Sequence, residues 1–171
     1  EKDGWLHLYS VPVSGGKATL LTPGNFEVEY VNIAANGAKM IYNSNQDDID
    51  RRHLWTVPID GSAKPSQLPW KSSGSEWQPS TTSDGFTALI HADSGVPPHV
   101  MVMSPDGRAH SLLENMLPST FAATALVTPQ PVMITATDGM PIHAQLFLPK
   151  DLKAGEKRPA LIFFHGGSRR Q

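Results

Sequence analysis

Residues 53–62 read His-Leu-Trp-Thr-Val-Pro-Ile-Asp-Gly-Ser, and two related stretches begin at His7 and His99. The copy at 7–16 keeps the apolar alternation and ends in Gly-Gly, and the weaker copy at 99–108 carries Asp-Gly near its end. The three copies start at positions 7, 53 and 99, so both intervals are 46 residues long. A repeat of about 45 residues with several turn signals has the length of one four-stranded β-propeller blade.

Turn signals recur between the copies and predict that each repeat folds as a series of hairpins. Asn36-Gly37 and Asp84-Gly85 each precede an apolar stretch, and such dipeptides supply the positive φ angles of a tight turn. Within 53–59 the side chains alternate between two faces of the predicted strand. One face carries Leu54, Thr56 and Pro58, and the other carries Trp55, Val57 and Ile59.

The repeats predict a mainly β fold that contains part of a β-propeller. We expect the last part of one blade (about 4–22), one full blade (about 24–69) and most of another (about 75–113). A closed ring needs at least about four blades, so three copies leave strand edges exposed. Exposed edges invite pairing with a second copy, which makes a homo-oligomer one expectation. An open β-meander or a sandwich with accidental internal similarity is the alternative.

The sequence pattern changes from residue 117 onwards. Leu-Pro-Ser-Thr-Phe at 117–121 is typical of a linker rather than of a strand or helix. We therefore assign residues 1–120 to the C-terminal blades of a propeller. Residues 121–171 are assigned to a linker, a β-hairpin and one further strand of a second, truncated domain.

Two apolar segments define that second domain. Residues 132–137 and 142–149 flank Asp138-Gly139, which predicts an antiparallel hairpin. The run Ala-Leu-Ile-Phe-Phe at 160–164 is continuously apolar, as is typical of a strand covered on both faces. The predicted sheet type thus changes from propeller-like to α/β-like within the last part of the chain.

Composition excludes several classes of function. The net charge is −2 and no basic block is present, so no nucleic-acid partner is expected. No apolar run approaches the roughly 20 residues that span a bilayer, so no membrane span is expected in this segment. The chain has no cysteine, which excludes disulfides, thiolate catalysis and Cys-type zinc sites. No cofactor or metal is predicted.

An acidic loop raises the question of a cation site. Carboxylates at alternating positions, as in Asp48 and Asp50, do bind calcium. The loop lacks the glycine and the distal glutamate of an EF-hand, however. We favour a solvated loop between strands in which the aspartates, Asp47 included, pair with Arg51 and Arg52.

The order of these segments is similar to a known family. Blade repeats, a hairpin ending in Leu-Phe-Leu-Pro at 146–149, and Pro-Ala-Leu-Ile-Phe-Phe-His-Gly-Gly at 159–167 together resemble the prolyl oligopeptidase family of serine peptidases. The loop Asn-Ser-Asn-Gln-Asp-Asp-Ile-Asp-Arg-Arg-His-Leu at 43–54 resembles the dipeptidyl peptidase IV-like branch. The resemblance implies a two-domain parent in which a propeller covers an α/β-hydrolase domain and admits only short peptides. The segment after the blades would then hold the first strands of that domain, including its third.

The resemblance also implies an activity. Short peptides would be hydrolysed, with release of N-terminal dipeptides, by a Ser-His-Asp triad whose serine lies in a G-x-S-x-G elbow. No G-x-S-x-G occurs in the 171 residues, so the chain alone is predicted to be inactive. A periplasmic or extracellular location is favoured by the same resemblance. The alternatives are a non-catalytic propeller interaction module and an esterase or acyl-peptide hydrolase of the same fold.

The candidate site residues are His165, Gly166 and Gly167. Acyl transfer builds negative charge on the carbonyl oxygen, and fixed donors there lower the barrier by about 3–4 kcal/mol. In α/β-hydrolases one donor comes from the loop after the third strand, where glycine lets the backbone approach the substrate. The dipeptidyl peptidase IV pattern has a tyrosine where this chain has His165, which leaves the amides of Gly166 and Gly167 as donors and gives His165 a part in shaping the loop. The alternative is that the glycines only turn the chain.

The remaining histidines are assigned to structure rather than catalysis. His7, His53 and His99 occupy the same position of the repeat, and a repeated structural role explains this better than a catalytic one. Three other histidines occur singly and are expected to be partly exposed structural residues: His91, His110 and His143.

Overall fold

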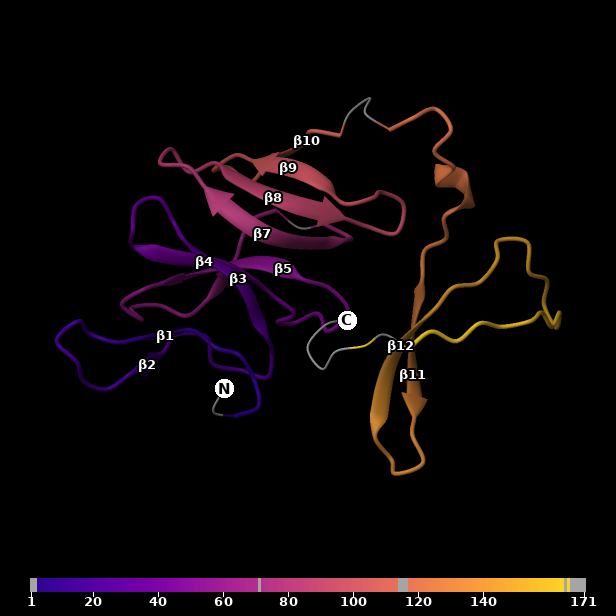
Figure 1. Cartoon of the computed structure of the whole chain (residues 1–171), viewed down its shortest axis with the longest axis horizontal. Coiled ribbons are helices and arrows are strands. Elements are labelled where there is room, and N and C mark those ends of the chain that lie inside the picture. The colour runs from indigo at the N-terminus through magenta and orange to yellow at the C-terminus, as the bar shows by residue number, and fades with distance from the viewer. Residues whose placement is uncertain (1–2, 71, 114–116, 165, 167–171) are drawn as a thin grey trace. The chain divides into compact units, whose positions relative to one another are not determined.

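The structure is a computed structural model that describes residues 3–70, 72–113, 117–164 and 166. The chain forms two compact units, Glu1–Phe121 and Ala122–Gln171. Figure 1 labels most strands of both units. The assignment of these two parts of the chain to a propeller and to a truncated hydrolase domain stays a prediction.

Three antiparallel sheets make up the first unit. The two-stranded sheet pairs β1 (Tyr9–Ser10) with β2 (Thr19–Leu20). The second sheet runs β3-β4-β5-β6 in chain order, and the third runs β7-β8-β9-β10. The bounds in the second sheet are Val28–Ile33, Lys39–Ser44, His53–Pro58 and Ser66–Gln67. Those in the third are Ser75–Thr81, Thr87–Ala92, His99–Met103 and Ala109–Ser111.

Each four-stranded sheet is a meander in which successive strands are neighbours, and this is the topology of a propeller blade. The expectation of a mainly β fold with four-stranded blades is confirmed. The last sheet departs from the prediction in one respect, because it has all four strands where most of a blade was expected. The short strand β10 completes it by pairing Ala109 with Met103 and Ser111 with Met101.

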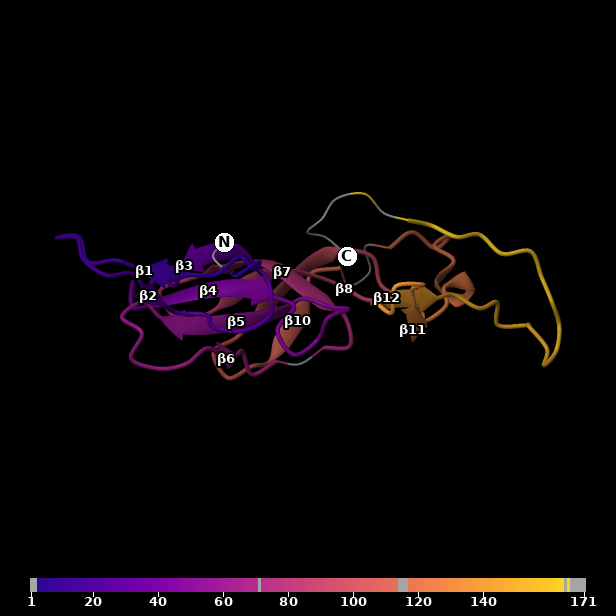
Figure 2. The same ribbon diagram turned by 90° about the horizontal axis from the view of Figure 1, so that it is seen from below.

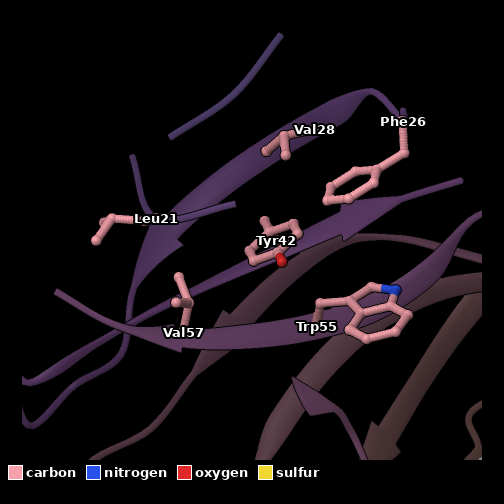
Figure 3. Close-up of a cluster of buried hydrophobic side chains, with 6 residues drawn as sticks. All are labelled: Leu21, Phe26, Val28, Tyr42, Trp55 and Val57. Carbon is pink, nitrogen blue, oxygen red and sulfur yellow. The ribbon is translucent and has the colours of Figure 1, made fainter. Parts of the chain in front are cut away.

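The middle strand β5 packs against a different sheet on each of its faces. Trp55 and Val57 belong to a cluster that also contains Leu21, from the chain just after β2. Figure 3 shows this cluster, whose buried members are Leu21, Phe26, Val28, Tyr42, Trp55 and Val57. Leu54 points the other way and packs on the third sheet, in a cluster with Leu89, Met101 and Met103. The predicted alternation along 53–59 is therefore correct, and it places β5 between two interfaces.

The hairpin turns differ from the prediction in which residue of each Asn-Gly or Asp-Gly pair has positive φ. Only the glycine of each Asn-Gly or Asp-Gly pair has positive φ, with values of 69° for Gly37 and 89° for Gly85. The residue before it serves through its side chain instead, since Asn36 Oδ1 accepts a hydrogen bond from the Ala38 amide at 3.0 Å. This combination is the type I turn followed by a left-handed glycine, a common hairpin connection.

The second unit is a hairpin with long connecting segments. A short 3₁₀ helix, η1 (Ala123–Ala125), precedes β11 (Gln130–Thr135), which pairs with β12 (Pro141–Leu146). The predicted hairpin is present, with β11 starting two residues earlier than expected. None of the helical segments in the described part of the chain has the length and apolar character needed to cross a bilayer.

The strand predicted at 160–164 does not form. These residues have no regular secondary structure, and Leu161 is 95% exposed. A strand is stabilised by ladder hydrogen bonds to its neighbours and, when it is apolar on both sides, by covering layers. The described residues of this unit supply neither, so the apolar run forms no strand and remains uncovered.

Because Leu54 contacts one sheet while it belongs to another, its truncation should weaken both. We expect Leu54→Ala to lower the free energy of unfolding by about 2–5 kcal/mol, the cost of a large-to-small change in a packed core. Urea unfolding measures the loss, and amide exchange should show reduced protection in both four-stranded sheets. Val13→Ala, at a fully exposed position of the same unit, is the control and should change stability by less than about 0.5 kcal/mol. Reduced protection in the second sheet alone would contradict the shared interface.

Candidate functional site

The predicted oxyanion segment is described only in part. His165 and Gly167 lie outside the described residues, and Gly166 is exposed. A Cβ placed on Gly166 would meet no other atom within 4 Å. The described residues therefore give no geometry for a carbonyl oxygen at this segment, and the oxyanion role of His165, Gly166 and Gly167 stays a prediction.

The connection that leads to this segment is organised around Arg158. Its guanidinium binds Asp151 through Nη1 and Oδ1 at 2.9 Å, and Glu156 through Nε and Oε1 at 2.7 Å. These ion pairs close the polar loop between β12 and the apolar run at 160–164. The guanidinium lowers the pKa of both the Asp151 and the Glu156 carboxyl groups through side-chain hydrogen bonds. Exposed pairs of this kind shape a loop but contribute little to stability.

A buried charged cluster lies in the first unit, between the two four-stranded sheets. Glu76 of β7 is 1% exposed, and its Oε2 lies 3.0 Å from Nδ1 of His53 on β5. Ser72 donates a short hydrogen bond to Oε1 of the same carboxylate. The Glu76 amide donates to the Arg52 carbonyl at 2.7 Å, so backbone and side chain both join β7 to the second sheet.

The cluster extends from His53 to the loop between β4 and β5. His53 Nε2 lies 3.3 Å from Asp48 Oδ2, and that oxygen also lies 3.3 Å from Nη1 of Arg51. Arg52 points elsewhere and pairs with Glu29 of β3 at 3.4 Å. The predicted pairing of the acidic loop with Arg51 is thus present, whereas the predicted pairing with Arg52 is wrong because Glu29 captures that side chain.

The opposite charges in this cluster shift the pKa values of His53 and Asp48. The hydrogen bond to Glu76 raises the pKa of His53, and the nearby carboxylates of Glu76 and Asp48 outweigh the opposing effect of burial. Partial burial alone would raise the pKa of Asp48, but hydrogen bonds from His53 and Arg51 lower it overall. The cluster therefore favours an imidazolium held between two carboxylates.

Both ring nitrogens of His53 are within hydrogen-bond distance of carboxylates, so neither is available to take a proton from a nucleophile. The cluster can hold two sheets together but cannot perform general-base catalysis. The equivalent histidines have other partners: His7 lies 3.4 Å from Asp3, and His99 Nδ1 contacts the Pro97 carbonyl at 2.9 Å. The shared repeat position thus does not give the three histidines one set of contacts.

His91 is more buried than predicted. It was expected to be partly exposed, but it packs edge-on against Trp70 and His99, with ring centroids 5.2 and 5.5 Å away. Burial lowers its pKa, so the neutral imidazole is favoured there. The sequence signal that indicates burial is its place within the apolar strand β8, between Ile90 and Ala92.

The two four-stranded meanders have the topology of propeller blades, and solved structures share this fold. Dipeptidyl peptidase 4 of Porphyromonas gingivalis matches with a TM-score of 0.67 and 18% identity, over 90% of this chain and 22% of that one. A puromycin-hydrolyzing peptidase of Mycobacterium tuberculosis matches with a TM-score of 0.67 and 18% identity, over 91% of this chain and 24% of that one.

Sequence comparison then identifies the family. The family model described as "Dipeptidyl peptidase IV (DPP IV) N-terminal region" matches residues 1–98. The chain belongs to the dipeptidyl peptidase IV family, and the resemblance noted in the sequence is confirmed. Dipeptidyl peptidase 4 of Trichophyton equinum is 23% identical over 98% of this chain and 22% of its own length. That of Arthroderma otae is 38% identical over 35% of this chain and 8% of its own. The chain thus spans about a fifth of the length of relatives such as the first.

The buried cluster predicts a pH dependence of stability. The folded-state pKa of His53 is raised, so its contribution to stability is complete below its ordinary pKa of about 6.5 and is lost as the pH rises through the folded-state value. We expect urea unfolding of the wild-type chain to show lower stability at about pH 8.5 than at about pH 6.

Glu76→Gln removes the main cause of this shift and should flatten the dependence over the same pH interval. His110→Gln, at an exposed position of β10, is the matched control and should leave it unchanged. An equally steep loss of stability in the Glu76 variant would show that another group is responsible.

Proposed function

We propose that residues 1–171 are part of a serine peptidase that hydrolyses short peptides and releases dipeptides from their N-termini. The observation that carries this proposal is the family membership of the blades, together with an alignment to a dipeptidyl peptidase 4 that covers 98% of the chain. That alignment continues past the blades into the hairpin unit. The proposal thus concerns a parent protein in which both parts of the chain take part.

The blades supply the wall that controls access to the active site. Their packing supports this role, because β5 is held on both faces and the Glu76–His53 contact adds a polar tie between sheets. Rigid blades at fixed angles exclude folded proteins and admit short chains. Selectivity for small substrates then follows from geometry rather than from side-chain recognition alone.

The segment 165–167 supplies part of the oxyanion site in this proposal. A serine from sequence outside these 171 residues attacks the scissile carbonyl, a histidine takes the serine proton, and the amides of Gly166 and Gly167 donate to the resulting oxyanion. The histidine then protonates the leaving amine, and water releases the acyl group by the same steps. His165 shapes the loop at the position where the related pattern has a tyrosine.

The proposal is tested with the longer protein encoded by the same gene. We expect it to react with a fluorophosphonate probe at one serine and to release a dipeptide, seen by mass spectrometry, from a pentapeptide with a free amino terminus. The same peptide acetylated at its N-terminus should not be cleaved. The 171-residue chain alone should remain unlabelled, because it contains no G-x-S-x-G. Stoichiometric labelling of the short chain, or an unreactive longer protein, overturns the proposal.

The oxyanion role predicts a specific backbone effect. Gly166→Pro removes one N–H donor and should lower kcat of the longer protein by about 10²–10³, with a smaller change in KM. Gly166→Ala keeps the N–H, and its Cβ has space, so it should lose far less activity. Equal losses in the two variants would assign the effect to chain conformation instead of the donor.

A further inference from the structure

The first strands of the two complete blades carry the same irregularity. In β3 the register shifts between Glu29 and Asn32, and in β7 it shifts between Trp77 and Ser80. Each bulge contains a residue with positive φ that is not glycine: Tyr30 at 41° and Gln78 at 54°. The two residues are 48 positions apart, as are the Asn36 and Asp84 turns, so the bulge belongs to the blade as a repeated unit.

This backbone conformation is unfavourable for both residues. Positive φ suits glycine, and asparagine or aspartate to a lesser degree, but is strained for a bulky side chain such as tyrosine. Strained residues of this kind persist where the surrounding structure holds them, and they gather at ligand-binding sites. Bulges also redirect side chains near such sites. A glycine at position 30 or 78 would give the same bend without strain, so the side chains themselves need a reason.

The two bulges lie where the sheets meet. β3 and β7 are each the edge strand of their own sheet, at one end of the strand order. Asn32 Nδ2 of β3 donates a hydrogen bond to the Pro79 carbonyl of β7 at 2.5 Å, and the amide of Ala35, two residues after β3, donates to Thr81 Oγ1 at 3.1 Å. Figures 1 and 2 show the strands that make up the two sheets. Tyr30 and Gln78 are therefore on neighbouring strands.

Both side chains face solvent and carry neutral polar groups. Tyr30 is 43% exposed and offers an aromatic face with a hydroxyl, while the exposed Gln78 offers an amide that both donates and accepts. The nearest acidic group on β3, Glu29, is already engaged by Arg52 and by Asn43 at 3.1 Å. An uncharged main chain with alternating donors and acceptors, and an apolar or proline side chain for the ring, complements this surface better than an ion does.

We infer that Tyr30 and Gln78 form a binding surface for an extended peptide at the junction of the two blades. The inference rests on the proposed peptidase function and adds residues that position the substrate away from the bond that is cleaved. The competing explanation is that the bulges only twist an edge strand away from unwanted pairing. That explanation requires the backbone shape and not the side chains.

Glycine substitutions separate the two explanations, because glycine keeps the bulge and removes the side chain. The ¹⁵N-labelled 171-residue chain is titrated with the pentapeptide Ala-Pro-Ala-Phe-Ala, which has a free amino terminus. We expect shift changes concentrated in β3 and β7, and about tenfold weaker binding for each of Tyr30→Gly and Gln78→Gly, the loss expected for one hydrogen-bonding contact. The Tm of both variants should stay the same or rise.

Phe86→Ala is the matched control, since this aromatic residue of the same unit is 40% exposed but lies in the turn after β7. It should bind the peptide as the wild type does. Unchanged affinity in both glycine variants, or no binding by the wild-type chain, overturns the inference. Dipeptide release by the longer protein is measured separately. If the chain binds the peptide but the longer protein releases no dipeptide, the result counts against the proposed function and not against this binding surface.

Discussion

The packing of β5 on both faces is the constraint on which the first unit depends. On one face Trp55 and Val57 pack with Leu21, just after the first sheet. On the other face Leu54, the residue next to Trp55, packs against the third sheet. A strand with two apolar faces is stable only when layers cover both of them. This requirement stacks the sheets and brings the edge strands β3 and β7 together. Apolar packing alone does not fix the exact position of one sheet on the other, whereas the hydrogen bond between Glu76 and His53 requires a specific geometry.

Much of this arrangement could be predicted because it is local in the sequence. Alternation along 53–59 and the Asn-Gly or Asp-Gly turns each depend on neighbouring residues, and similar stretches recur every 46 residues; together these signals place both four-stranded sheets correctly. The Glu76–His53 contact joins residues 23 positions apart on different sheets, and no local pattern marks it. The positive φ of Tyr30 could not be predicted from the sequence either, because neither tyrosine nor its neighbours favour that conformation.

At the candidate site, by contrast, the sequence pattern did not predict the local structure. The apolar run at 160–164 has the composition of a buried strand, but composition records only a tendency to be covered. Within the described residues of the second unit, β11 and β12 pair only with each other, and the apolar run stays exposed. The segment 165–167 was singled out by its sequence motif alone, and the 171 residues contain no G-x-S-x-G with which that motif could act. The oxyanion role of this segment therefore stays a prediction.

The different partners of the three repeated histidines have a consequence for assembly. Repeats that resemble one another risk pairing in the wrong order or exchanging between molecules as they fold. His7 contacts Asp3, His53 contacts Glu76 and Asp48, and His99 contacts the Pro97 carbonyl. Among the residues that the structure describes, only the second copy contacts a carboxylate from the following sheet, so that junction is chemically unlike its neighbours. Divergence at one shared position thus makes one junction between sheets chemically distinct, so a polar contact as well as apolar packing favours the observed order of these sheets.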